Sequence, residues 1–135
     1  MSLNFVGVEV RQNTAEIRGS THQSVSEQVN ELYLTIAEDE RLSKLISEMM
    51  ENSNLRKDLN PADQISLDFV ILTGLRRIEN IHLQYLDGIL SNHAFDRIGM
   101  NFYIKNYVKE IWEMYKGGFD SDFVAFFETF RDEVK

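Results

Sequence analysis

The sequence predicts an all-α fold, and three observations support this prediction. Its 135 residues include one proline and seven glycines, so few positions would interrupt a helix. Apolar residues recur at three- and four-residue spacing through most of the chain. The hydrophobic content of 43% is ordinary for one soluble globular domain. We therefore expect a single-domain helical bundle of about five helices around a long central helix, at about residues 61–91.

The N-terminal part is expected to be helical in two sections, from about residue 4 to residue 37. Residues 1–20 are predicted to be a helical lead-in, and residues 21–135 the domain itself. Ser24 and Glu27 match a capping box, which would begin the second section. The apolar residues that follow at helical spacing are Val25, Val29, Leu32 and Ile36.

A short amphipathic helix is predicted at residues 40–51, followed by the polar loop "NSNLRKDLN". The central helix should begin at Asn60 and Pro61. Asparagine caps free N–H groups, proline suits the first helical position, and Asp63 favours the positive end of the helix dipole. We expect this helix to reach about Ser91, with Gly74 and a second glycine, at position 88, as weak points.

Two aromatic-rich helices are expected after the central one. The first covers about residues 93–116 and ends at the two glycines that follow it. The second begins after Asp120 and Ser121, and its phenylalanines share an arc of roughly 100°. Core packing is the favoured interpretation of this arc, and a homodimer contact or a membrane-facing patch is the alternative. The candidate interaction surface comprises Phe123, Phe126, Phe127 and Phe130.

Three polar residues of the central helix fall among apolar ones in a helical projection: Asp68, Glu79 and His82. A buried carboxylate destabilises the fold unless it is paired. Glu79 therefore needs a cation, which Arg76 could supply from one turn earlier. Arg11 or Arg18 could do so across the bundle. A structural ion pair is the favoured interpretation, and a ligand-binding or catalytic role is the alternative.

Glu79 and His82 also form an E-x-x-H motif, a spacing that di-iron helical bundles use to hold metal. Such a site needs two of these motifs and two further glutamates on four helices. Neither His22 nor His93 has a glutamate three residues before it. We therefore predict no metal site, and keep as the alternative a mononuclear site of Glu79, His82 and another carboxylate.

An amide pair lies beside two arginines on the polar side of the central helix. Together they could bind a small anion or a carboxylate through the arginine forks. A hydrogen-bonded seam between helices, or simple exposure to solvent, is the favoured interpretation. The candidate ligand-binding or structural polar network comprises Arg76, Arg77, Glu79, Asn80, His82 and Gln84.

Composition excludes several classes of function. The net charge of −8 and the pI near 4.8 argue against broad binding to nucleic acids or anionic membranes. The chain has no cysteine, which excludes disulfides, thiolate metal sites and cysteine nucleophiles. No stretch of about 20 apolar residues is present, and Glu9 breaks the opening apolar run too early for a signal peptide. Neither a phosphate-binding glycine loop nor G-x-S-x-G occurs, and we expect no cofactor.

Several short motifs resemble those of a bacterial protein family that has no assigned activity. They are "RQN", an N-x-L stretch before acidic residues, "EN…QY…G" in the central helix, and a helix with tryptophan. The matching residues are Arg11, Gln12, Asn13, Asn30, Leu32, Glu79, Asn80, Gln84, Tyr85, Gly88 and Trp112.

This resemblance implies a membrane anchor, because members of the family carry one N-terminal transmembrane helix. The segment "NFVGVEV" would then be the trailing end of an anchor that begins upstream. Arg11 and Arg18 behind it would place the domain on the cytoplasmic side of the bacterial inner membrane. The resemblance also implies an aromatic or apolar residue in relatives at the position of His82, which weakens the metal interpretation further.

These observations favour a non-enzymatic module, tethered to the bacterial membrane, that binds a protein partner or a second copy of itself. The alternative is a sensor of a small anionic molecule, or a hydrolase, that uses the polar face of the central helix. Nucleic acid is not an expected partner, and the membrane is expected to be contacted only through the anchor.

Overall fold

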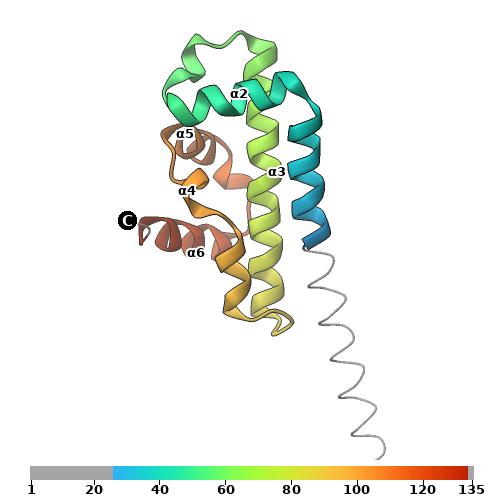
Figure 1. The fold of residues 1–135 in the computed structure, drawn as a ribbon. Coiled ribbons are helices and arrows are strands. Elements are labelled where there is room, and N and C mark those ends of the chain that lie inside the picture. Colours follow the sequence, from blue (N-terminus) through green and yellow to red (C-terminus); the bar gives the residue numbers. More distant parts are fainter. Residues whose placement is uncertain (1–25, 134–135) are drawn as a thin grey trace, which may run out of the picture.

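The computed structural model describes residues 26–133 of the chain. The predicted lead-in at residues 1–20, its arginines Arg11 and Arg18, and the predicted cap Ser24 lie outside the described residues. Within the described range the regular structure is helical, with no strand. Figure 1 shows one long helix, α3, with the other helices arranged around it. The predicted all-α fold with a long central helix is therefore confirmed.

Helix α3 spans Pro61–Leu86 and begins where the sequence predicted. The Asn60 side chain accepts a hydrogen bond of 2.9 Å from the Asp63 N–H, and Pro61 takes the first helical position. The helix ends five residues earlier than expected. Gly88 adopts φ of 75°, a left-handed conformation that glycine tolerates and that stops a helix at its C-terminus.

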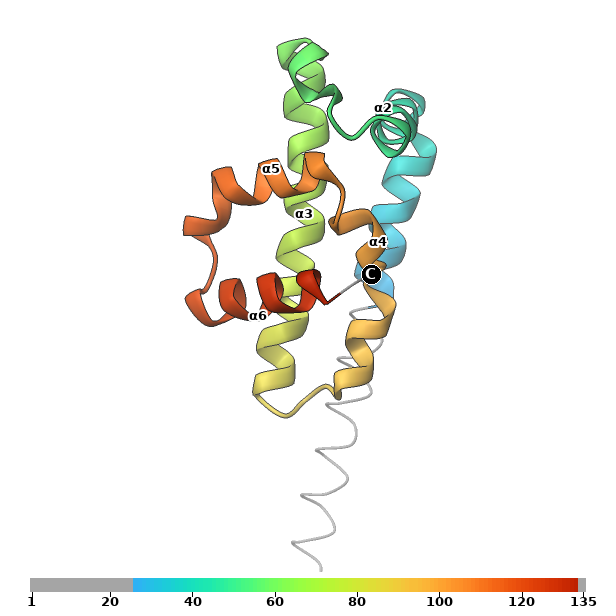
Figure 2. The same cartoon turned by 90° about the vertical axis from the view of Figure 1, so that its left-hand side faces the viewer.

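Two helical segments precede α3. The first helical segment, residues 26–38, runs beside α3, and α2 (Glu40–Glu51) crosses near the start of α3 (Figures 1 and 2). Leu45 and Met49 bury the apolar face of α2, as its predicted amphipathic pattern requires. The predicted polar loop after α2 contains a 3-10 turn, η1 (Leu55–Asp58), whose Leu55 is buried.

The prediction of one continuous helix at residues 93–116 is wrong. The chain there forms a 3-10 helix, η2 (Asn92–Arg97), a single turn, α4 (Met100–Tyr103), and a separate helix, α5 (Asn106–Tyr115). Gly99 separates η2 from α4 with φ of 74°, and this left-handed residue changes the chain direction. After a short 3-10 turn, η3 (Lys116–Gly118), Asp120 caps α6 (Ser121–Asp132) by accepting from the Phe123 N–H.

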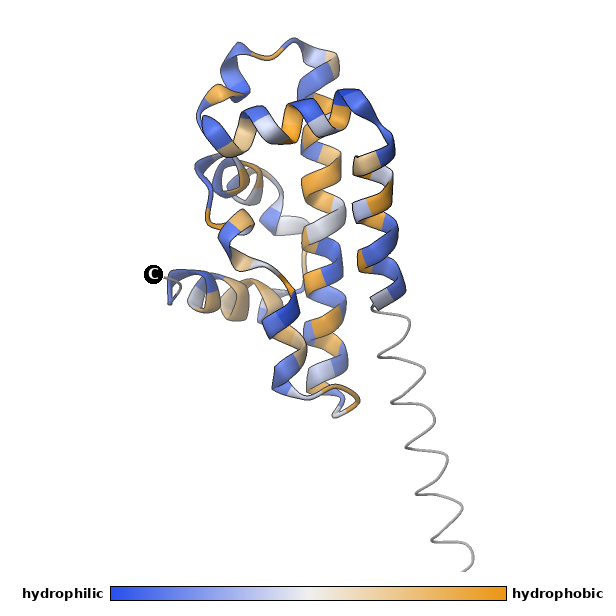
Figure 3. Cartoon of the chain, viewed as in Figure 1, coloured by the Kyte–Doolittle hydropathy of each residue, from blue (hydrophilic) through white to orange (hydrophobic). Residues whose placement is uncertain are grey.

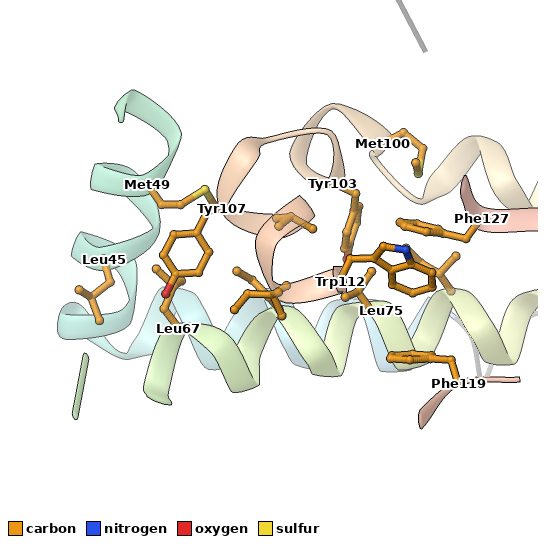
Figure 4. Packing of buried hydrophobic residues seen from close by; sticks show 14 of the residues in the cluster. Leu45, Met49, Leu67, Leu75, Met100, Tyr103, Tyr107, Trp112, Phe119 and Phe127 are labelled. Atoms are coloured by element: carbon orange, nitrogen blue, oxygen red, sulfur yellow. The ribbon is translucent and has the colours of Figure 1, made fainter. Parts of the chain in front are cut away.

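The main core lies between α3, α5 and α6, with α2 closing one end. Trp112 is fully buried, and its ring centroid lies 4.5 Å from that of Phe127 and 5.8 Å from that of Phe123. Figure 4 shows Tyr107, Trp112 and Phe127 side by side with other core residues along α3. Figure 3 shows apolar residues along much of the length of α3, consistent with its central place. A smaller cluster around Phe95 packs near the other end of α3.

Candidate functional site

Glu79 joins the central helix to the start of α6. Its carboxylate accepts a hydrogen bond from Arg76 Nη1 at 3.1 Å, so the predicted pairing with Arg76 is confirmed. The other carboxylate oxygen accepts from the Asp120 N–H at 2.8 Å. Only 14% of the Glu79 side chain is exposed, and each of its two carboxylate oxygens accepts a hydrogen bond from the protein.

Arg76 completes this junction from the solvent side. Its Nη1 also donates to the Gly118 carbonyl at 3.1 Å, and its guanidinium lies 3.9 Å from the centroid of the Phe119 ring. The arginine thus contacts a carboxylate, a carbonyl and an aromatic face from one position. Because these contacts occupy both residues, the Arg76–Glu79 pair acts as a clamp on the α5–α6 turn.

His82 lies in a different environment, among aromatic rings. Its ring stacks on Phe126 with centroids 4.3 Å apart and lies 5.7 Å from Phe123. Neither ring nitrogen has a hydrogen-bond partner within the described part of the chain. Burial lowers the pKa of His82, and the charges of Asp120 and Asp122 oppose that effect only in part. The imidazole is therefore neutral at pH 7 and acts as a flat, mostly apolar ring.

Glu79 and His82, although three residues apart, have separate sets of partners. The Glu79 carboxylate accepts a hydrogen bond from the Asp120 N–H, whereas the His82 imidazole stacks on the Phe126 ring. Residues 26–133 contain no group of three or more histidines, cysteines, aspartates or glutamates that could hold a metal ion.

The amide pair and the second arginine do not form one pocket with this clamp. Asn80 is half-buried and makes no hydrogen bond to the described residues, and Gln84 has a buried, unpartnered Oε1. Arg77 points elsewhere and lines a cavity toward the first helical segment. The six residues of the predicted polar network therefore divide among at least three environments.

The predicted phenylalanine surface is mostly core. Phe123 and Phe127 are 0% exposed, so neither can contact a partner while the domain stays folded. Phe126 and Phe130 are half-buried and pack on Phe95 and on each other. The core interpretation is correct for the first two residues, because α6 turns their side of its arc toward Trp112.

A buried ion pair at Asp68 was not predicted as a site, although Asp68 stood out in the sequence. Its carboxylate accepts from Arg56 Nη2 at 2.8 Å, from Arg56 Nε at 3.2 Å and from the Tyr107 hydroxyl at 2.7 Å. The hydrogen bond to Asp68 raises the pKa of Arg56, and burial raises that of Tyr107. Arg56, Asp68 and Tyr107 thus hydrogen-bond to one another, and these bonds connect η1, α3 and α5.

An apolar hollow lies between the first helical segment, α2, α3 and α4. Its volume is about 590 Å³, and its lining is mostly apolar, including Leu32, Ile46 and Val70. A neighbouring cavity of about 210 Å³ lies between the first helical segment, α3 and η2. Tyr103 borders both cavities, with its hydroxyl against Gly74.

Gly74 allows this arrangement. A Cβ at this position would lie 2.3 Å from the Tyr103 hydroxyl oxygen, closer than two such atoms can approach. Burial raises the pKa of Tyr103 to about 12. The mid-helix glycine was treated in the sequence as a weak point of the helix, but its role is to admit the end of a tyrosine.

One flank of α3 stays uncovered. Ile65 and Phe69, one turn apart, are 54% and 57% exposed. Leu72 continues the same flank and is half-buried. A helix at the centre of a bundle normally has its apolar residues covered, so this flank is a candidate contact surface.

Comparison with protein-family models, curated proteins and solved structures yields no match for this chain. Among the described helices, none is long and apolar enough to cross a membrane.

Proposed function

We propose that this chain is a non-enzymatic protein-interaction module that pairs with a second copy of itself through the exposed flank of α3. The observation that carries the proposal is the pair Ile65 and Phe69, two large apolar side chains more than half exposed on the central helix. Two-fold pairs are the commonest oligomers, and one helix face meeting its own copy is self-complementary.

The polar clusters of the described range favour binding over catalysis. The carboxylates of Glu79 and Asp68 have their oxygens taken up by hydrogen bonds to the protein itself. His82 is surrounded by rings and shares no hydrogen bond with a nucleophile or a carboxylate in that range. A general base must reach the proton that it removes, and none of these three groups is placed to do so.

Sedimentation equilibrium over a wide range of protein concentration tests the proposal. We expect a monomer–dimer equilibrium for the wild type, and a shift to monomer for the double variant Ile65→Lys and Phe69→Asp. Met114→Lys is a matched control, because Met114 is 52% exposed on α5, away from this flank. A wild-type chain that is monomeric over the whole concentration range would contradict the proposal.

We also propose that the domain is tethered on the cytoplasmic side of the bacterial inner membrane. The motifs around Arg11 and in the central helix support this part, since the family they resemble has an N-terminal anchor. The gene sequence upstream of "FVGVEV" provides the test. A stretch of about 20 apolar residues is expected there, and its absence would remove the tether.

A further inference from the structure

The two cavities beside the first helical segment form one compartment with an apolar part and a cationic end. Leu32, Tyr33, Ile98 and Tyr103 line both cavities, which therefore adjoin. The larger cavity, of about 590 Å³, is within the size range of small-molecule sites in proteins. Its lining is apolar, apart from two serines and the tyrosine hydroxyls.

The smaller cavity carries the positive charge. Arg77, which is half-buried, and Arg97, which is exposed at its rim, both line this cavity, and neither forms an ion pair with any described residue. The Nη1 of Arg77 is buried and has no hydrogen-bond partner in the described range. The chain has 22 acidic residues and 14 basic ones, so carboxylates that could have neutralised these two arginines are plentiful.

Arg56 and Arg76 have carboxylate partners, whereas Arg77 has none among the described residues. Arg56 forms a two-pronged pair with Asp68, and Arg76 binds Glu79. The buried Nη1 of the half-buried Arg77 has lost its hydrogen bonds to water without gaining a partner among the described residues, which is unfavourable. Burial accordingly lowers the pKa of Arg77, with the charge of Glu31 opposing this only partly. An anion in the smaller cavity would supply the missing acceptor.

We propose that this compartment binds a free organic acid with an apolar tail, its carboxylate against Arg77 and Arg97 and its tail in the larger cavity. An arginine fork suits the planar, two-oxygen geometry of a carboxylate. Tyr103, whose hydroxyl has no hydrogen-bond partner among the described residues, can donate a further bond at the junction of the cavities. Of the polar network predicted from the sequence, only Arg77 takes part, and the proposal does not depend on self-association.

Isothermal titration calorimetry with octanoate, kept below its micellar range, is the primary test. We expect saturable binding of one octanoate per chain, at least tenfold weaker binding of octan-1-ol, and none of acetate. Octanol retains the tail without the charge, and acetate retains the charge without the tail. Equal binding of octanoate and octanol, or no binding of octanoate, would overturn the proposal.

Two variants and one control locate the site. Arg77→Gln should weaken octanoate binding by about ten- to a hundredfold and leave octanol unchanged, as expected for loss of a charged hydrogen bond. Val70→Trp should fill the larger cavity and abolish binding of both compounds. Lys109→Gln removes the same charge from an exposed position on α5 and should change neither.

Circular dichroism confirms that each variant is folded before its affinity is compared. If Arg77→Gln and Lys109→Gln weaken octanoate binding equally, the cationic end is not the site, and the proposal is wrong. A final experiment with phosphatidylglycerol vesicles tests whether the protein binds a lipid surface and not a free acid. Sedimentation of the protein with vesicles, without binding of monomeric octanoate, would mean that a lipid surface and not a free acid is recognised.

Discussion

The two sides of α3 are built differently. On the side of α5 and α6, Trp112, Phe123 and Phe127 are 0% exposed and pack ring against ring. On the side of the first helical segment, cavities of about 590 and 210 Å³ remain. The same helix therefore supports a close-packed core on one side and a hollow on the other.

The charged groups follow the same division, although the uncharged Trp112 Nε1 and the two ring nitrogens of His82 also lack a hydrogen-bond partner among the described residues. On the packed side, the carboxylates of Asp68 and Glu79 are fully hydrogen-bonded and tie α3 to other elements. On the hollow side, Arg77 and Tyr103 have no hydrogen-bond partner among the described residues. The packed side thus accounts for stability, and the hollow side has both room and unused hydrogen-bonding capacity.

The largest expected difference is between matched leucine truncations on the two sides. Leu75 is 0% exposed in the main core, and Leu75→Ala should lower the free energy of unfolding by about 2–5 kcal/mol. Leu32 is half-buried beside the cavities, and Leu32→Ala should cost about 1 kcal/mol. Urea denaturation followed by circular dichroism measures both. Equal losses would mean that the hollow side is as tightly packed as the core.

The next largest effect is expected at the clamp. Glu79→Gln keeps the shape of the side chain but removes the charge that pairs with Arg76 and accepts from the Asp120 N–H. We expect a loss of about 1–3 kcal/mol in the free energy of unfolding. Glu133→Gln, at an exposed position after α6, serves as the control. An unchanged melting temperature for Glu79→Gln would show that the carboxylate is solvated.

A smaller effect, with a change of sign, is expected at Gly74. Alanine favours a helix over glycine by about 1 kcal/mol, but its Cβ would collide with the Tyr103 hydroxyl. Because Tyr103 borders the cavities and can shift into them, Gly74→Ala should cost only about 1 kcal/mol. In a Tyr103→Phe background the same substitution should become stabilising. The test is thermal unfolding of the wild type, the two single variants and the double variant. If the effects of the two substitutions on stability are additive, the contact between position 74 and the Tyr103 hydroxyl is contradicted.

The smallest expected effect is a pH dependence from His82. Its pKa is lowered by burial in the folded state, so the unfolded chain binds a proton that the folded chain does not. The free energy of unfolding should therefore fall as the pH drops through 6.5, by at most about 1.4 kcal/mol per pH unit from this one group. His82→Phe should flatten the profile between pH 7.5 and 5.5. His93→Gln, at an exposed residue of η2, is the comparison variant.

Local chemistry explains which parts of the fold were predictable. Asn60 and Pro61 fix the start of α3 through their own backbone preferences, and Asp120 does the same for α6. The C-terminal ends of helices were harder to predict from the sequence, because a glycine inside a helical pattern can either continue the helix or adopt a positive φ that ends it. Gly74 continues α3, whereas Gly99 breaks the predicted fourth helix.

Sites built from distant residues were the least predictable. The Arg76–Glu79 pair was predictable because both residues lie on one helix, three positions apart. The partner of Asp68 was not, since Arg56 comes from the segment that was predicted only as a polar loop. The cavity at Arg77 depends on how the first helical segment, α3 and η2 meet, which no local pattern specifies.

Trp112 gives the protein a built-in optical reporter. It is the one tryptophan of the chain and is fully buried between α3, α5 and α6. Its fluorescence should be emitted at short wavelength in the folded state and move to the red on unfolding. The cavities are lined by tyrosines and contain no tryptophan in their walls. Occupation of the hollow should therefore leave the emission wavelength unchanged, so that one spectrum separates ligand binding from loss of structure.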